Sequence, residues 1–242
     1  MEGRKNKNFR VGILGGMGPM AGVLLQRLII EATPASRDQD HLEVICFTNP
    51  KITDRTDSLM RDGGESFTRE IVDSIKVFES MGVDVIAIPC HTAHTRFLEI
   101  QRRSTLPILN LVKITIEEVE KEAGRIGILA TTGTIREKIY RNNEFLEIIE
   151  PDEGNQEKIM EMIYRIKGGE LITQNEIEGI AMEFKSRGVE TLLLACTEFS
   201  LYFENFDRLG LKVFDPLRIL ARYLVELNYR EKVRVEFTAQ IE

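Results

Sequence analysis

Two cysteines stand at matching places in the two halves of the chain. Gly82 to Cys90 and Gly188 to Cys196 each span eight positions, and an apolar run leads to the cysteine in both stretches. A thiol has a reference pKa of about 8.5, so a modestly positive environment can ionise one of two facing thiols while the other stays protonated. A helix that begins after the cysteine provides such an environment. The pair is therefore predicted to remove a proton from one face of a carbon atom and deliver a proton to the opposite face.

The third cysteine, Cys46, has a different setting. It lies inside the apolar residues 44–47 (Val-Ile-Cys-Phe), where a small buried side chain is the ordinary role of a cysteine. The three cysteines are far apart and show no Cys-x-x-Cys spacing, which argues against a disulfide framework and against a zinc ribbon. We therefore expect Cys46 to take no part in catalysis.

Two histidines follow the first cysteine closely. Cysteine and histidine are common zinc ligands, but the adjacent Cys90 and His91 are awkward as joint ligands, and no second cluster completes a set of four. His94 is predicted to cap a helix or to support the site from behind. His91 is expected to contact substrate or to raise the thiolate fraction of Cys90, and its own charge can change at about pH 6.5.

Small-residue loops follow the first strand of each half. The loop 15–19 (Gly-Gly-Met-Gly-Pro) has bare backbone amides and precedes a helix, so it can hold a carboxylate. The hydroxyls of Thr131, Thr132 and Thr134 can do the same in the second half. The first loop lacks the complete Gly-x-Gly-x-x-Gly pattern of a dinucleotide site. A tight turn without a ligand is an equally good interpretation of each loop taken alone.

The elements that must position these residues follow the alternating pattern of an α/β protein, which predicts parallel strands covered by helices. The predicted strands cover residues 10–14, 42–48, 83–89, 108–109, 125–130, 145–149, 191–195 and 212–214. The predicted helices cover residues 21–33, 64–81, 113–123, 157–167, 174–187 and 216–228, and loops are predicted at 50–62 and 151–155. Both cysteines are thus expected at the carboxyl ends of strands, where ligands bind in such sheets.

An internal repeat divides the chain into two similar halves. The first half opens with Val-Gly-Ile-Leu at 11–14 and the second with Ile-Gly-Ile-Leu at 126–129. The opening glycine precedes the cysteine by 78 residues in the first half and by 69 in the second, a difference that loop insertions can absorb. We therefore expect an α/β fold of two pseudo-symmetric lobes, each a mainly parallel sheet flanked by helices.

The composition limits the classes of partner. The chain has 242 residues, enough to bury a substantial core, and its net charge of −7 argues against nucleic acid or an anionic membrane as the main partner. It has no tryptophan and only five tyrosines, which argues against a stacking surface for single-stranded nucleic acid. The apolar run after the polar residues 1–10 is too short for a signal peptide or a membrane span, so we expect a cytoplasmic protein.

Four motifs together resemble the aspartate/glutamate racemase family over nearly the whole chain. They lie at residues 12–19 (GILGGMGP), 49–56 (NPKITDRT), 90–94 (CHTAH) and 196–198 (CTE). The resemblance implies two lobes, residues 1–111 with 215–242 and residues 112–214, with the active site between them. It also implies a homodimer and catalysis without pyridoxal phosphate, metal or any other cofactor.

The resemblance also implies a role for each motif residue. Cys90 and Cys196 match the catalytic pair that acts on opposite faces of Cα, and Arg55 and Lys167 match residues that bind the side-chain carboxylate of the substrate. The remaining residues expected around the substrate are Met17, His91, Thr92, Thr131, Thr132, Thr134, Thr197 and Glu198. The family usually has asparagine at the position of His91, which bears on substrate choice because histidine is larger and can become charged.

The leading prediction is therefore an isomerase, a cofactor-independent racemase acting on aspartate. Glutamate or a broader set of amino acids is the alternative substrate that the departure at His91 leaves open. An alternative of another class is a protein that binds an acidic amino acid in the same pocket without converting it.

Overall fold

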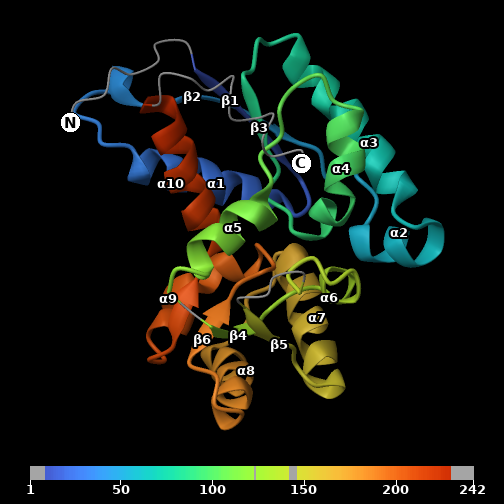
Figure 1. Ribbon diagram of the computed structural model, residues 1–242, viewed down its shortest axis with the longest axis vertical. Helices are drawn as coiled ribbons and strands as arrows, with labels where there is room; N and C mark the ends of the chain where they lie inside the picture. The colour runs from blue at the N-terminus through green and yellow to red at the C-terminus, as the bar shows by residue number, and fades with distance from the viewer. Residues whose placement is uncertain (1–8, 123, 142–145, 230–242) are drawn as a thin grey trace.

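The computed structural model describes residues 9–122, 124–141 and 146–229, and these contain two parallel β-sheets (Figure 1). The first sheet has the order β2-β1-β3 and the second the order β5-β4-β6-β7. The strands are β1 Arg10–Gly15, β2 Glu43–Thr48, β3 Val85–Ala87, β4 Arg125–Ile128, β5 Glu147–Ile149, β6 Thr191–Leu193 and β7 Lys212–Phe214. Of the predicted strand 108–109, only a parallel bridge between Ile108 and Ile86 forms. Phe145, predicted to begin β5, lies outside the described residues.

Helices connect the strands, as the alternating pattern predicts. They are α1 Pro19–Ala32, α2 Arg55–Asp62, α3 Glu65–Glu79, α4 Phe97–Arg102, α5 Leu111–Val119, α6 Thr132–Arg136, α7 Glu153–Lys167, α8 Gln174–Ser186, α9 Phe203–Asp207 and α10 Pro216–Tyr229. Short 3₁₀ turns lie at Asp38–Asp40, Thr92–Arg96 and Phe199–Tyr202. In the part of the chain that the structure describes, none of the helices is both long and apolar enough to cross a bilayer. The α/β fold with two parallel sheets is confirmed.

Two predicted loops are wrong because side-chain caps begin helices inside them. Asp54 accepts hydrogen bonds from the amides of Thr56 and Asp57 and starts α2 within the segment 50–62. That helix is mostly polar, so its sequence carries little of the apolar periodicity on which the prediction rested. Asp152 accepts from the amide of Asn155 in the same way, so α7 begins at Glu153 inside the predicted loop 151–155.

Three layers of apolar side chains hold the sheets and helices together. One face of the first sheet packs on α3 and α4, and one face of the second packs on α7 and α8. The central layer lies between the sheets and contains side chains of α1, α5 and α10 together with residues of β1, β3, β4 and β6. Neighbouring residues of a strand face different layers, as Ile13 and Leu14 do in β1. The two halves of the chain therefore share the central layer of the core.

Matching hydrogen bonds confirm the repeat of the two halves. The guanidinium of Arg10 at the start of β1 donates to Glu43 on β2 and to the carbonyl oxygens of residues 81 and 82. The guanidinium of Arg125 at the start of β4 donates to Glu147 on β5 and to the carbonyl oxygens of residues 187 and 188. Each half thus places its first, second and third strands in the same arrangement.

The last described helix, α10, returns from the second sheet to the first half of the chain. It begins directly after β7 and packs against α1 and α5 (Figure 1). This path is the one expected if residues 215–242 belong to the first lobe. The predicted lobe boundaries at residues 111 and 214 stay a prediction, because α5 and α10 lie together in the central layer.

Gly127 gives a direct test of how closely β4 and α8 approach. A Cβ atom at this position would lie 2.5 Å from Cδ1 of the buried Phe184 and 2.9 Å from Cδ2 of Leu192. We expect Gly127→Ala to lower the free energy of unfolding by about 1–3 kcal/mol because the core must be overpacked. Urea titration measures this change.

The matched control is Gly179→Ala on α8, where an added Cβ has nothing within 4 Å. This change should raise stability by about 0.5–1 kcal/mol because alanine favours a helix. Equal effects of the two substitutions would contradict the close packing of β4 on α8.

Candidate active site

One small pocket collects most of the residues that the sequence singled out. It encloses about 270 Å³. Ten of the predicted site residues line it, namely Met17, Arg55, Cys90, His91, Thr92, Thr131, Lys167, Cys196, Thr197 and Glu198. The other lining residues are Asp54, Thr56 and Ala195. Since both halves of the repeat contribute side chains, the pocket lies where the halves meet.

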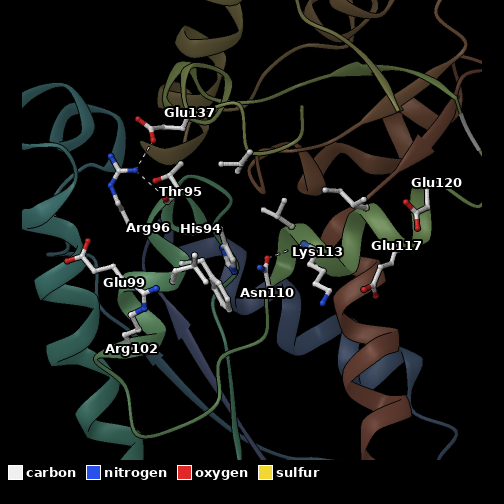
Figure 2. A pocket seen from close by; sticks show the side chains of 15 residues that line it. His94, Thr95, Arg96, Glu99, Arg102, Asn110, Lys113, Glu117, Glu120 and Glu137 are labelled. Atoms are coloured by element: carbon white, nitrogen blue, oxygen red, sulfur yellow. Dashed lines mark hydrogen bonds and ion pairs between the residues drawn. The ribbon is translucent and has the colours of Figure 1, made fainter. Parts of the chain in front are cut away.

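A wider hollow lies between α4 and α5 and holds none of the predicted site residues (Figure 2). Charged side chains of both signs line it, among them Arg102, Lys113 and Glu117. His94 belongs to this hollow and not to the small pocket. Its Nδ1 lies 2.8 Å from the carbonyl oxygen of Cys90 and its Nε2 accepts a hydrogen bond from the amide of Leu111. His94 thus supports the backbone behind the pocket.

The two matched cysteines face the same pocket from different halves of the chain. Cys90 follows β3 by three positions and Cys196 follows β6 by three positions, so both lie just beyond the carboxyl ends of their strands. Each side chain is 5% exposed and both thiols are free. The short 3₁₀ turns Thr92–Arg96 and Phe199–Tyr202 follow them, where the start of a helix was expected. The third cysteine, Cys46, is partly buried on β2 and does not line the pocket.

Cys196 has a carboxylate as its nearest charged neighbour. Its Sγ lies 3.0 Å from Oε2 of Glu198 and donates to it. Burial raises the pKa of the Cys196 thiol well above its ordinary value, and Glu198 raises it further, whereas Lys167 has the opposite but smaller effect. One of the two thiols is expected to stay protonated, and the raised pKa of Cys196 is in the direction of that state. The thiol is protonated at neutral pH, with an acceptor for its proton in contact.

The loop after β1 holds that same carboxylate. The amide of Gly18 donates to Oε1 of Glu198 over 3.0 Å, so the loop binds a carboxylate that the protein itself supplies. The preceding Gly16 has φ +107°, and a Cβ there would lie 2.2 Å from the carbonyl oxygen of Asn49. The loop is therefore a turn that requires glycine at position 16, and binding of a ligand carboxylate by this loop stays a prediction.

The contact between Glu198 and Cys196 gives a testable pH dependence. We expect Glu198→Gln to lower the pKa of the Cys196 thiol, because the substitution removes the negative charge that disfavours the thiolate. The pH profile of alkylation by iodoacetamide measures this pKa when Cys46 and Cys90 are replaced by serine.

The matched control is Glu204→Gln, since Glu204 pairs with Arg218 at the surface. It should leave the profile of Cys196 unchanged. A midpoint for Glu198→Gln that stays in place or moves to higher pH would contradict the proposed effect of the carboxylate.

Three threonine hydroxyls form a buried cluster beside the pocket. The Oγ1 atom of Thr92 lies 2.8 Å from that of Thr131 and 3.1 Å from that of Thr134, which joins the first half of the chain to the start of α6. Thr134 is buried behind the pocket and does not line it. Thr132 also lies outside it, because its hydroxyl accepts from Gln156 on α7. Of the three threonines expected in this loop, only Thr131 reaches the pocket.

Two cations and one carboxylate line the other part of the pocket. Arg55 is 6% exposed, and its Nη1 donates to the carbonyl oxygens of Ile52 and Thr53, while its buried Nε has no partner. Nζ of Lys167 lies 3.6 Å from Oδ2 of Asp54. Burial alone would lower the pKa of Lys167, but Glu198 and then Cys196 and Asp54 raise it above its ordinary value. Lys167 therefore stays charged in the pocket.

His91 is also buried in the pocket wall, with 2% of its surface exposed. Burial, and to a smaller extent His94, lowers the pKa of His91 to about 3. The expected change of charge at about pH 6.5 is therefore wrong, and a neutral imidazole gives Cys90 no positive charge. Among the residues that the structure describes, no group of three or more His, Cys, Asp or Glu side chains is placed to hold a metal ion.

A comparison with protein families identifies the family of this chain. A model described as Asp/Glu/Hydantoin racemase matches residues 14–224 of the chain. The chain belongs to the Asp/Glu/hydantoin racemase family. The matched range includes every residue that lines the small pocket.

Individual relatives of this racemase family span most of the chain. It is 27% identical over 225 residues to the broad specificity amino-acid racemase RacX of Bacillus subtilis, covering 89% of this chain and 96% of the relative. It is 28% identical over 147 residues to a glutamate racemase of Shewanella woodyi, covering 57% of this chain and 55% of the relative. The aspartate racemase structure of Picrophilus torridus matches with 28% identity and a TM-score of 0.77, covering 97% and 100% of the two chains.

Asp54, Thr56 and Ala195 line the pocket of this racemase family member without having been predicted there. The sequence offers a signal for the first two, since an aspartate followed by polar residues is a typical helix N-cap. That signal places α2 beside the pocket and, with it, the side chains at its start. Ala195 directly precedes Cys196, and its sequence shows nothing beyond the end of an apolar run.

Proposed function

We propose that the chain is a cofactor-independent aspartate racemase in which Cys90 and Cys196 are the acid and the base. The observation that carries this proposal is the placement of two buried, free thiols in one pocket, each from one half of the repeat. Inversion of Cα needs one group on each face of the carbon, and a repeated fold supplies opposed groups. Membership of the Asp/Glu/hydantoin racemase family supports the same chemistry.

In the proposed reaction one thiolate takes the proton from Cα and the opposite thiol gives its proton to the other face. The roles of the two sulfurs reverse with the enantiomer that is bound. The contact of Cys196 with Glu198 suits both directions, because the carboxylate can take the thiol proton before Cys196 acts as the base. When Cys196 acts as the acid, its raised pKa keeps the proton in place until the reaction.

The charges in the pocket support an acidic amino acid as the substrate. The buried Arg55 and the partly buried Lys167 are cations that can bind a side-chain carboxylate. Thr92 and Thr131 offer hydroxyls to the amino-acid head. The similarity to the aspartate racemase of Picrophilus torridus, which covers 97% of this chain, favours aspartate over glutamate. We further propose that the protein acts in the cytoplasm as a homodimer and without nucleic acid or membrane as partner.

Circular dichroism of L-aspartate during incubation with the reduced protein tests the proposed activity. The signal is expected to decay to zero as the two enantiomers reach equal concentration. No decay with aspartate, glutamate or other amino acids would leave the non-catalytic binding protein as the function.

A broader substrate range is the second candidate, favoured by the similarity to the broad specificity racemase of Bacillus subtilis and by His91. Initial rates across a panel of L-amino acids decide between these candidates. We expect the highest kcat/KM for aspartate. Similar values for aspartate and for neutral amino acids would favour the broad range.

A further inference from the structure

A buried hydrogen bond joins His91 in the pocket wall to Tyr140 in the other half of the chain. The Nδ1 atom of His91 lies 2.7 Å from the hydroxyl oxygen of Tyr140, and the two ring centroids are 5.8 Å apart. Both residues are 2% exposed. Tyr140 follows α6 and belongs to the central apolar layer.

The other ring nitrogen of His91 is unusual because it is buried and has no hydrogen-bond partner. Leaving such a polar atom without a partner is costly, and buried polar atoms that lack partners in a protein call for an explanation. His91 lines the pocket whereas Tyr140 does not. The ring edge that bears Nδ1 is therefore held by Tyr140, and Nε2 is the polar atom left for an occupant of the pocket.

The tautomer follows from the chemistry of the two partners. The contact allows either atom to be the donor. A phenol is a stronger hydrogen-bond donor than a neutral imidazole N–H, and an imidazole nitrogen is the stronger acceptor, which favours Tyr140 as the donor to Nδ1. The single ring proton of neutral His91 then lies on Nε2. Burial lowers the pKa of His91 to about 3 and raises the pKa of Tyr140, so both groups keep these protons at neutral pH.

We propose that Tyr140 is a positioning residue that holds His91 as a neutral ring whose Nε2–H donates to a carboxylate oxygen of the bound amino acid. This proposal rests on the proposed function, because the occupant of the pocket is taken to be an amino acid. The donor adds a directed contact to a carboxylate without adding charge beside Cys90. Arg55 and Lys167 remain the sources of positive charge in the pocket.

Nitrogen NMR of the full-length protein labelled with ¹⁵N-histidine tests the tautomer directly. The chain has only three histidines, and the variant His91→Asn identifies the signals of His91. We expect a proton on Nε2 and an acceptor shift on Nδ1 in the free protein. Saturation with racemic aspartate, whose composition does not change during turnover, or with succinate should move the Nε2–H signal to lower field. A proton on Nδ1 in the free protein would overturn the proposal.

Tyr140→Phe removes the hydroxyl and keeps the ring. We expect a mixture of His91 tautomers and an increase of about five- to tenfold in KM for aspartate and in Kd for succinate, with little change in kcat. The control Tyr202→Phe removes a hydroxyl that accepts from the amide of Ile172 outside the pocket, and it should change none of these quantities.

The outcomes separate this proposal from the proposed function. If no amino acid is racemised but the Nε2–H tautomer and its shift with succinate are found, the positioning by Tyr140 stands and the racemase activity fails. If aspartate is racemised but the His91 signals do not shift with either ligand, the positioning proposal is overturned. It is also overturned if neither ligand binds. Should Tyr140→Phe fail to fold, the tautomer and the ligand shift of the unaltered protein still decide.

Discussion

Replacement of Cys90 or Cys196 by serine is expected to reduce aspartate racemisation by at least about a thousandfold, within the range that a general acid or base contributes. A serine hydroxyl keeps nearly the same shape but gives up its proton far less readily than a thiol. Each face of Cα depends on one of these groups, so either substitution should stop conversion in both directions. Initial rates from L-aspartate and from D-aspartate, followed by circular dichroism, measure the loss.

Cys46→Ser is the matched control for these variants. Cys46 is partly buried on β2, and its Sγ lies 4.0 Å from Oγ1 of Thr48. We expect this variant to keep nearly full activity. An equal loss of activity in all three serine variants would mean that the substitutions act through folding, and full activity of Cys90→Ser would contradict the two-thiol mechanism.

Replacement of Arg55 by methionine is expected to lower kcat/KM for aspartate by at least about a hundredfold. Methionine fills similar space but removes a buried cation, and loss of one partner from a buried, hydrogen-bonded charge pair costs about 2–5 kcal/mol. Arg55 is already fixed by the carbonyl oxygens of Ile52 and Thr53, so its guanidinium needs little ordering when a carboxylate arrives. Most of the loss should fall on KM because the contact is to a carboxylate that takes no part in the proton transfer.

The control for this prediction lies on the same helix. Arg61 has an exposed side chain and pairs only weakly with Asp62, so Arg61→Met should leave KM unchanged. The two variants therefore differ in burial while they remove the same charge from α2. An unaltered KM for aspartate in Arg55→Met would contradict the assignment of Arg55 to the substrate carboxylate.

The sheets and the position of the two cysteines could be predicted because both depend on local patterns. Apolar runs mark the buried strands, and the shared offset from Gly82 to Cys90 and from Gly188 to Cys196 places each thiol beyond a strand. Parallel strands then bring these ends to one edge. Helix α2 was not predicted because its sequence is mostly polar and has no apolar stripe. The helix depends instead on the cap at Asp54 and on the burial of Arg55.

The electrostatics of the site could not be predicted, because they depend on contacts between distant parts of the chain. His91 is neutral because it is buried in the pocket wall, where its partner Tyr140 lies 49 residues away in the sequence. The pKa of Cys196 is raised because the thiol is buried and because Glu198, which the amide of Gly18 holds, lies beside the sulfur. Thr131 and Thr132 are neighbours in the sequence, but Thr131 lines the pocket whereas Thr132 contacts Gln156 on α7. This difference depends on the packing of α7.

The most direct test of the two-thiol mechanism is the incorporation of deuterium at Cα when L-aspartate is incubated with the protein in deuterium oxide. Chiral separation followed by NMR measures the label in each enantiomer at early times. We predict deuterium in the D-aspartate that forms and protium in the L-aspartate that remains, because different groups remove and deliver the proton. Deuterium entering recovered L-aspartate as fast as D-aspartate, or entering neither enantiomer, would contradict the proposed action of Cys90 and Cys196.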